Sequence, residues 1–175
     1  MFDNEGNYIN LEAPAYEEFS YDEPTWSEIL PGLWQGGTSE RDDRTELAYE
    51  ATEIADVTKD HFDFVATLYA WAKPADWFVR EYRYGVYDGD GTDIDYDEIH
   101  ALAGTVHAEW KRGNRVLVRC QAGWNRSGLV MALVLMRDGY RADEAISLIR
   151  DRRSEWALCN TDFEKYLLGL DTATV

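Results

Sequence analysis

The chain has 175 residues, of which 45% are hydrophobic and 14% aromatic, and its 34 acidic side chains outnumber 17 basic ones to give a formal net charge of −17. This length and apolar content suffice for one sizeable core, so we expect a single folded domain. The negative charge repels nucleic acid and anionic lipid headgroups, which argues against both as partners. A general bias toward acidic residues, as in salt adaptation, is the simpler origin of this charge.

The cysteine content and the hydropathy pattern indicate the compartment. The chain has two cysteines and contains neither a secretory apolar segment nor an apolar run of membrane-spanning length. We therefore expect a reducing, cytoplasmic setting with no membrane contact.

The first segment of the chain is acidic and lacks any hydrophobic period. Residues 1–26 carry scattered aromatic side chains, and no basic residue precedes Arg41. We expect an N-terminal arm here that is extended or wraps around the domain. The folded domain is expected over residues 27–170, followed by a short C-terminal tail at 171–175.

Apolar periodicity and turn residues predict strands that alternate with helices. The strands are expected at Ile29–Trp34, Phe62–Tyr69, Phe78–Val86 and Arg115–Arg119. The helices are expected at Arg44–Lys59, Asp95–Arg112, Arg126–Asp138, Ala142–Arg152 and Thr161–Leu168. This alternation predicts an α/β domain with a central, mostly parallel sheet flanked by helices on both faces, whose reactive groups gather at the carboxyl ends of the strands.

The segment Cys120–Ser127, with the sequence CQAGWNRS, lies between an apolar strand and an apolar helix. The N–H groups of such a loop and of the first helical turn lack intrahelical partners, and the helix dipole adds positive charge, so an anion is the expected guest. Arg126 can bind a phosphate edge with its planar guanidinium group. The same field favours the thiolate form of a cysteine, which makes Cys120 a candidate nucleophile. The hydroxyl of Ser127 could donate a hydrogen bond to that sulfur.

These residues resemble a known family. The stretch Val116–Gly128 resembles the signature loop of cysteine-dependent protein tyrosine phosphatases, in their dual-specificity branch. Weaker similarities extend from Ile29–Gly37 to the segment 143–163, so the resemblance covers about residues 27–170. It implies a phosphatase-like fold and hydrolysis of phosphomonoesters through a phosphocysteine intermediate. The implied catalytic residues are Cys120, Arg126, Asp88 and Ser127, and the implied phosphate-binding residues are Gln121, Ala122, Gly123, Trp124 and Asn125.

This reaction needs a general acid that protonates the leaving oxygen. The stretch 87–95 supplies several aspartates on a glycine-rich loop. The Asp-Gly pair at 88–89 resembles the acid-bearing loop of the family, so Asp88 is our choice and Asp90, one glycine away, is the alternative. Asp95 with Glu98 instead has the spacing of a helix capping box.

Two positions depart from the family pattern or lie outside it. Arg119 precedes the nucleophile, where most relatives carry histidine, and it either adds a second cation beside Cys120 or points away along the strand. Cys159 has no partner in a Cys-x-x-Cys pair. We expect it to be a core or surface thiol, with a redox partnership with Cys120 as the alternative.

Several further residues have simple interpretations. His61, His100 and His107 are dispersed without metal-ligand spacing, so neither a metal nor another cofactor is expected. The Trp124 side chain is expected to pack. The segment Ala70–Trp77 is expected to be an ordinary connection between two strands, with substrate contact as the alternative.

The substrate class follows from what the chain lacks. It has no long insertion of the kind that deepens the pocket of tyrosine-only relatives, so we expect a phosphorylated protein carrying phosphotyrosine or phosphoserine/threonine, or a small phosphomonoester. A phosphoinositide phosphatase is one alternative, but Gln121, Ala122 and Asn125 are neutral where lipid-directed relatives carry lysines. An RNA 5′-triphosphatase is a second alternative, which the net charge disfavours. A non-catalytic phosphate-binding module, or pseudophosphatase, is the third.

Overall fold

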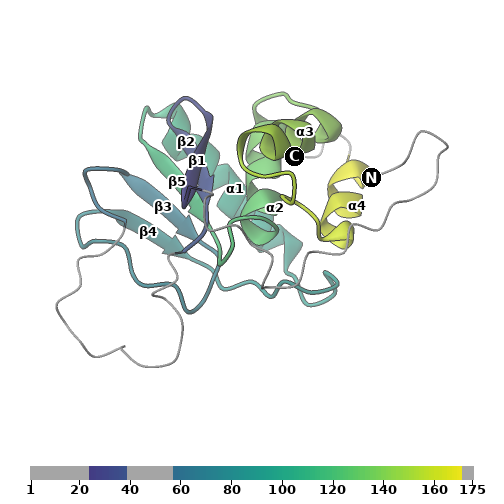
Figure 1. Cartoon of the computed structure of the whole chain (residues 1–175), viewed down its shortest axis with the longest axis horizontal. Coiled ribbons are helices and arrows are strands. Elements are labelled where there is room, and N and C mark those ends of the chain that lie inside the picture. Colours follow the sequence, from purple (N-terminus) through teal and green to yellow (C-terminus); the bar gives the residue numbers. More distant parts are fainter. Residues whose placement is uncertain (1–23, 39–56, 171–175) are drawn as a thin grey trace.

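A computed structural model describes residues 24–38 and 57–170 of the chain. Its strands are β1 (Trp26–Leu30), β2 (Leu33–Gly36), β3 (Phe64–Thr67), β4 (Arg80–Arg83) and β5 (Val116–Arg119). Its helices are α1 (Tyr96–Lys111), α2 (Arg126–Arg137), α3 (Ala142–Arg152) and α4 (Thr161–Gly169). The strands form one sheet in the order β1-β2-β5-β3-β4 (Figure 1).

The sheet is mostly parallel, as expected. Strands β2, β5, β3 and β4 run in the same direction, and only β1 is antiparallel to its neighbour. The register places Gly36, Arg119 and Thr67 side by side at the ends of three neighbouring strands. The loops that follow these strands therefore leave the sheet at one common edge, which is the edge where the sequence predicts the reactive groups.

The prediction of a single strand at Ile29–Trp34 is wrong, because the chain reverses in its middle. Leu30 ends β1, Leu33 begins β2, and these two residues pair across the turn. Proline and glycine favour tight turns, and Gly32 adopts a φ of +79°, which side-chain-bearing residues rarely adopt. The Glu28 carboxylate also accepts a hydrogen bond of 2.8 Å from the Gly32 N–H. The Pro-Gly pair within the apolar run was the signal for this hairpin.

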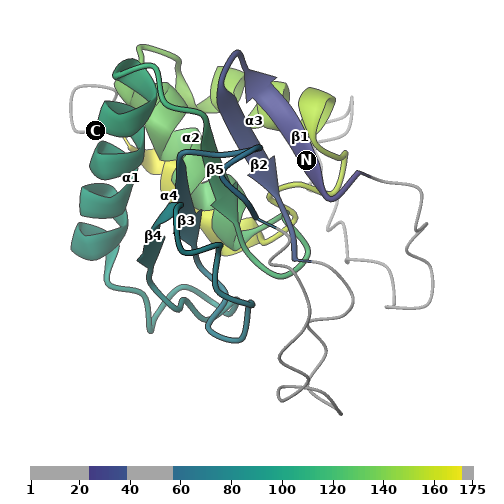
Figure 2. The ribbon, with the colours of Figure 1, turned by 90° about the vertical axis from the view of Figure 1, so that its left-hand side faces the viewer.

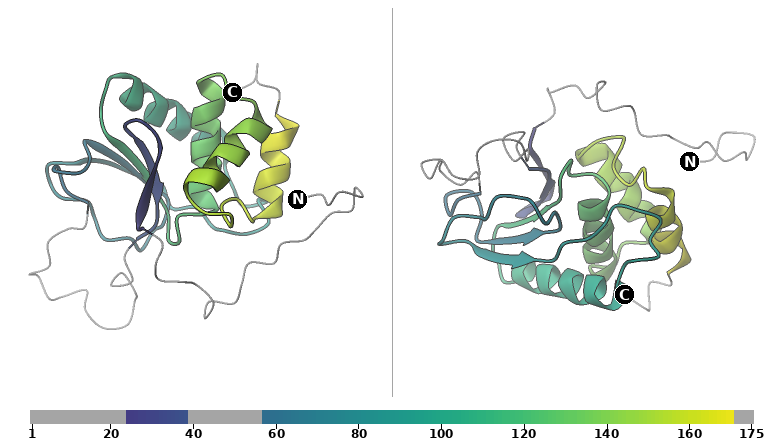
Figure 3. Two further views of the ribbon diagram at one scale, coloured as in Figure 1. Left: turned by 45° about the horizontal axis from the view of Figure 1, so that its top comes forward. Right: turned by 90° about the horizontal axis from the view of Figure 1, so that it is seen from below.

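The two faces of the sheet pack differently. Alternate residues of the central strands, among them Ala66 and Val118, pack against α1–α4, which lie together on one side of the sheet (Figures 1 and 3). On the opposite face Val65 and Leu117 pack with residues from the segments 57–62 and 75–79. The α/β class with a mostly parallel sheet is thus confirmed, but within residues 24–38 and 57–170 the helices cover one face of the sheet and not both as expected. The helix expected at Arg44–Lys59 lies outside the described residues over 44–56, and residues 57–59 are not helical.

Helix α2 is the centre of the helical layer. It contacts the sheet and each of the other three helices, and all its residues from Arg126 to Met136 are buried. A helix that is apolar on every side is suited to such a position. Because α2 begins at Arg126, its N-terminus is held inside the protein, whereas the loop before it is only partly buried and Ala122 is exposed.

The four described helices agree closely with expectation. Asp95 caps α1, with its Oδ1 accepting a hydrogen bond of 3.1 Å from the Glu98 N–H, so the predicted cap is confirmed. Helix α1 packs along one end of the helical layer (Figure 2). Strands β3 and β4 are shorter than predicted, although the pairing continues irregularly beyond them through a hydrogen bond from the Val86 N–H to the Leu68 carbonyl.

Most of the proposed arm and all of the proposed tail, at residues 1–23 and 171–175, lie outside the described part of the chain. Within residues 24–38 and 57–170, none of the helices combines the length and the apolar content that crossing a membrane requires.

Candidate active site

The segment that joins β5 to α2 runs from Cys120 to Arg126, the first residue of α2, and we call it the phosphate loop. Its first N–H donates to the Gly36 carbonyl of the neighbouring strand at 3.1 Å. Gly123 has a φ of +80°, and a Cβ atom there would lie 2.3 Å from the carbonyl carbon of Gly36. No side chain fits in this space, so glycine is required for the loop to curl against β2.

Arg153, which follows α3, supports the phosphate loop from outside. Its guanidinium group donates to the carbonyls of Ala122 (3.2 Å) and Gly123 (3.3 Å), and also to the Pro24 carbonyl (2.6 Å). The Gln35 side-chain amide on β2 donates to the same Gly123 carbonyl at 3.0 Å. The carbonyl groups of Ala122 and Gly123 therefore point away from the inside of the loop, toward two buried polar side chains.

Two further loop carbonyls also face outward. The Gln121 carbonyl accepts a hydrogen bond of 2.8 Å from the Thr38 N–H, and the Trp124 carbonyl accepts one of 3.3 Å from the Leu158 N–H. The described residues contain no cis peptide bond, and in a trans peptide the N–H points opposite to the C=O. The N–H groups of residues 122–125 are therefore directed toward the inside of the loop, where they can donate to an anion.

Cys120 and Ser127 lie on the two sides of this loop. The Sγ of Cys120 is 3.3 Å from the Oγ of Ser127, and both residues are buried. Ser127 is in the first turn of α2, so its hydroxyl group is held by the helix that follows the loop. The predicted pair of a thiol and a neighbouring hydroxyl group is brought together.

Arg126 is buried, and one of its guanidinium N–H groups makes no hydrogen bond to any residue that the structure describes. One of its terminal nitrogens donates to the Val86 carbonyl at 3.2 Å, and the guanidinium group lies over the Tyr69 ring with its central carbon 5.3 Å from the ring centroid. Its Nε atom has no hydrogen-bond partner among the described residues. A buried donor without a partner costs free energy, and a bound oxyanion would satisfy it.

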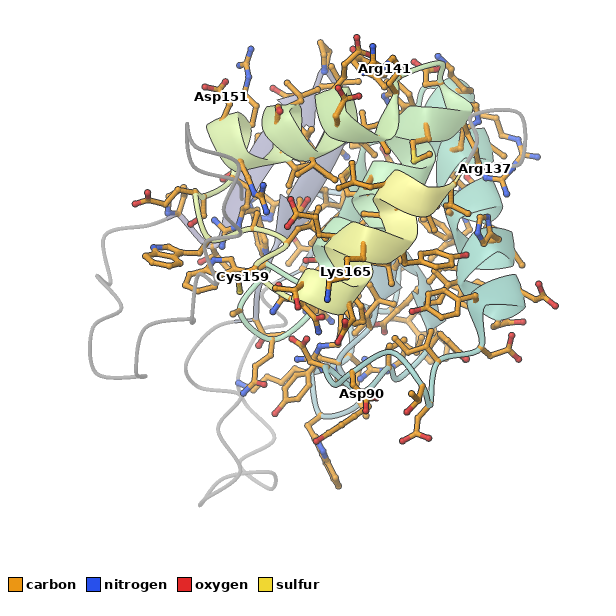
Figure 4. The ribbon with its side chains drawn as sticks, turned by 90° about the vertical axis from the view of Figure 1, so that its right-hand side faces the viewer. Asp90, Arg137, Arg141, Asp151, Cys159 and Lys165 are labelled. Atoms are coloured by element: carbon orange, nitrogen blue, oxygen red, sulfur yellow. The ribbon has the colours of Figure 1, made fainter. Side chains whose placement is uncertain are left out.

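Asp88 faces Arg126 from the loop after β4. Its Oδ2 lies 3.7 Å from the Arg126 Nε. The alternative acid, Asp90, accepts hydrogen bonds from the Thr92 N–H and hydroxyl group instead, and these lower the pKa of Asp90 below its ordinary value. Figure 4 shows Asp90 on the outer bend of this loop. Of the two candidates, Asp88 is therefore the one whose contacts include Arg126.

Arg119 points away from Cys120. Its buried guanidinium group donates to the Thr67 hydroxyl on β3 (2.9 Å) and to the Glu81 carboxylate on β4 (3.2 Å), and also to the Lys73 carbonyl. Successive residues of a strand face opposite sides of the sheet, which accounts for this direction. Of the two possibilities drawn from the sequence, the second is the observed one.

Cys159 lies two residues before the first residue of α4 and is labelled in Figure 4. Its thiol donates to the Asn125 Oδ1 at 3.4 Å. Burial raises the pKa of the Cys159 thiol above its ordinary value, so it stays protonated at neutral pH. Neither Cys159 nor Cys120 forms a disulfide in this structure.

The two aromatic features near the site differ in exposure. Trp124 is buried and so packs as expected, and Trp71, in the segment Ala70–Trp77, is 60% exposed, which fits both a plain connection and a substrate contact. The described residues contain no cluster of histidine, cysteine and carboxylate side chains that could hold a metal ion. The supporting roles of Gln35, Thr38 and Arg153 were not predicted from the sequence, nor were the hydrogen bonds of Asn160 to Asp88 and Gly89. No local pattern identifies them, because each contacts a loop distant in the chain.

Comparisons with known proteins agree with this geometry. The family model described as the dual specificity phosphatase catalytic domain matches residues 51–172. The putative tyrosine phosphatase 123R of invertebrate iridescent virus 6 is 32% identical over 68 residues, which make up 38% of this chain and 47% of that protein. The match thus spans about half the length of this viral relative.

Solved structures share the fold at low identity. A mouse putative dual specificity phosphatase, in complex with zinc tungstate, has a TM-score of 0.62 and 20% identity, with 87% of this chain and 92% of that chain covered. Human DUSP28 has a TM-score of 0.65 and 21% identity, with 82% and 90% covered. Since the family model matches most of the chain, the protein belongs to the family of dual specificity phosphatase catalytic domains.

Proposed function

We propose that this protein is a dual-specificity protein phosphatase, which hydrolyses phosphotyrosine and phosphoserine or phosphothreonine in proteins through a phosphocysteine intermediate. The observation that carries the proposal is the convergence of Cys120, Arg126 and Asp88 on one loop whose carbonyls face outward. Membership of the phosphatase family supports the same reaction class.

In the first step the phosphoryl group binds in the phosphate loop. Its non-bridging oxygens accept hydrogen bonds from the loop N–H groups and from Arg126, which stabilise the charge of the transition state. The Cys120 thiolate attacks phosphorus and forms an S–P bond. The P–O bond to the leaving group breaks as Asp88 gives its proton to that oxygen.

In the second step a water molecule attacks the phosphorus of the phosphocysteine. The Asp88 carboxylate takes a proton from this water and is ready to act as an acid again. The S–P bond breaks and its electron pair returns to sulfur, while the Ser127 hydroxyl, 3.3 Å away, donates a hydrogen bond to the departing thiolate. Inorganic phosphate is released.

The substrate class rests on the charge of the loop and of the chain. The loop side chains Gln121, Ala122 and Asn125 are neutral, so Arg126 is the one cation within the phosphate loop. A net charge of −17 would repel polyanionic substrates such as RNA or highly phosphorylated lipid headgroups. Both features favour a substrate with a single phosphoryl group.

The test is turnover of p-nitrophenyl phosphate by the full chain. We expect activity in the wild type, no activity in Cys120→Ser, and near-normal activity in the matched variant Cys159→Ser. The variant Asp88→Asn should be slow and lose the part of the pH profile that requires a protonated acid, whereas Asp90→Asn should behave as the wild type. If Asp90→Asn lost activity and Asp88→Asn did not, Asp90 would be the general acid.

A substrate panel then tests the specificity. Phosphotyrosine and phosphoserine/threonine peptides should both be hydrolysed faster than an inositol phosphate or 5′-triphosphorylated RNA. Turnover of either of the last two alone would replace the proposal by the corresponding alternative. Binding of phosphopeptides without turnover of any substrate would identify a pseudophosphatase.

A further inference from the structure

The carboxylate of Asp88 is held by two asparagine side chains, one at each oxygen. The Asn125 Nδ2 donates to Oδ2 at 3.3 Å, and the Asn160 Nδ2 donates to Oδ1 at 3.0 Å. The Asn160 Nδ2 also donates to the carbonyl of the next residue, Gly89, at 2.8 Å. Asn125 belongs to the phosphate loop and Asn160 to the start of α4, so two separate elements meet at this carboxylate.

The orientation of the Asn160 amide follows from its other contacts. Asn160 caps α4, and its Oδ1 accepts hydrogen bonds from the N–H groups of Asp162 (3.1 Å) and Phe163 (3.3 Å). A backbone N–H can only donate, so the amide oxygen must face the helix. The Nδ2 group is then left facing Asp88.

The orientation of the Asn125 amide is determined in the same way. Its Oδ1 accepts a hydrogen bond of 2.9 Å from the Asn160 N–H and a second one from the Cys159 thiol. The Nδ2 of Asn125 therefore also faces Asp88. The Asn160 N–H is thus hydrogen-bonded to the Asn125 side chain, and both side-chain amides are hydrogen-bonded to the Asp88 carboxylate.

The loop that carries Asp88 has no regular secondary structure, and besides the two asparagines the Asp88 carboxylate has the 3.7 Å ion pair with Arg126. Residues 85–95 contain neither helix nor strand, and Gly91 has a φ of +80°. The Asp88 side chain is 32% exposed. A general acid must lie within hydrogen-bond distance of the leaving oxygen, and each extra conformation that its loop samples reduces the productive fraction.

We propose that Asn125 and Asn160 are positioning residues that hold Asp88 over the phosphate loop, so that the placement of the general acid depends on the N-terminus of α4. This inference rests on the phosphatase function proposed above. In this proposal the Asn125 side chain binds the general acid Asp88 and does not contact the phosphate directly. Neither asparagine touches the reacting atoms, and both act through Asp88.

The experiment uses Asn160→Ser, because serine caps a helix about as well as asparagine but lacks the amide donor. Two substrates are compared. Phenyl phosphate has a basic leaving group that needs a proton, whereas 2,4-dinitrophenyl phosphate releases a stable anion that does not. The quantity compared is kcat/KM, because it reports the formation of the phosphocysteine and not its hydrolysis, in which Asp88 serves every substrate as a base. We expect kcat/KM to fall about tenfold or more on phenyl phosphate and less than about twofold on the dinitrophenyl ester.

The matched control is Asn114→Ser. The Asn114 amide also donates to a carboxylate, that of Glu109, but at the far end of α1. This variant should leave both rates unchanged. A second variant, Asn125→Ser, removes the other donor and should show the same dependence on the leaving group as Asn160→Ser.

A double-mutant cycle with Asp88→Asn tests whether the asparagines act through the acid. In the Asp88→Asn background, Asn160→Ser should lower the rate on phenyl phosphate less than about twofold. The inference is overturned if Asn160→Ser lowers kcat/KM equally for both substrates or lowers it for neither. It is also overturned if Asn160→Ser lowers kcat/KM by the same factor in the Asp88→Asn background as in the wild type. Turnover by the wild type but not by Cys120→Ser establishes the function independently of these outcomes. A wild type without turnover overturns both proposals.

Discussion

The Sγ of Cys120 lies 3.3 Å from the Oγ of Ser127, and both side chains are buried where β5 passes into α2. The hydroxyl group can stabilise a thiolate that leaves phosphorus in the second step of the proposed reaction. In Ser127→Ala we expect kcat to fall roughly 10–100-fold, because this factor corresponds to the free energy of one hydrogen bond to a charged group. Because the first step is less affected, the phosphocysteine should accumulate, and a burst of nitrophenolate equal to the enzyme concentration should appear. A uniform slowing without a burst would contradict this role.

The space at Gly123 predicts a strong effect of adding one methyl group. Gly123→Ala combines an unfavourable positive φ with a Cβ atom 2.3 Å from the Gly36 backbone. We expect a loss of about 2–4 kcal/mol in the free energy of unfolding, measured in urea, and weaker inhibition by inorganic phosphate.

The control for this prediction is Gly113→Ala. Gly113 has a φ of +85°, but no atom lies within 4 Å of the added Cβ. Only the backbone cost of about 1 kcal/mol should remain, and phosphate inhibition should not change. Equal losses in the two variants would mean that contact with Gly36 is unimportant.

The contacts of Arg119 predict an effect on stability without one on catalysis. Its buried guanidinium group is paired with Glu81, so Arg119→Met should lower the free energy of unfolding by about 3 kcal/mol. The rate on p-nitrophenyl phosphate should stay within about twofold, because the side chain faces away from Cys120. Arg83 pairs with the same carboxylate but is 33% exposed, and Arg83→Met should cost less than about 1 kcal/mol. A large loss of activity in stable Arg119→Met would show that Arg119 acts on the nucleophile after all.

The pairing of Asp63 predicts how stability depends on pH. Hydrogen bonds from Arg115 and Lys59 hold the pKa of Asp63 far below its ordinary value of 3.8. In the unfolded chain Asp63 takes up its proton near that ordinary value, whereas in the folded protein it does so only at lower pH. Its contribution to stability is therefore present above about pH 4 and is lost as the pH falls toward the folded pKa.

Denaturant unfolding between pH 2 and pH 7 measures this contribution. Asp63→Asn should be less stable than the wild type near pH 7, and the difference should shrink below pH 4. Curves that stay parallel over the whole range would contradict the assignment. Glu81 and Glu109 also have lowered pKa values, so part of the acid sensitivity should remain in the variant.

The features that could be read from the sequence are local ones. The buried helix after Arg126 follows from an unbroken apolar run, and the cap at Asp95 follows from residues within one turn of each other. The neighbourhood of Cys120 and Ser127 is equally local, because a strand, a short loop and a helix determine it. The hairpin at Gly32 is the local feature that was misread, since the apolar residues on both sides of the turn form one continuous pattern.

By itself, the sequence determined the family resemblance, the alternation of strands and helices, and the loop that holds Cys120 and Arg126. Only the tertiary structure decided that Asp88 and not Asp90 faces Arg126, that Arg119 turns toward Glu81, and that Asn160 bonds to Asp88. The physical reason is that these contacts join segments far apart in the chain. Such segments meet only when the parallel register brings the ends of several strands to one edge, and no local preference encodes which side chains then touch.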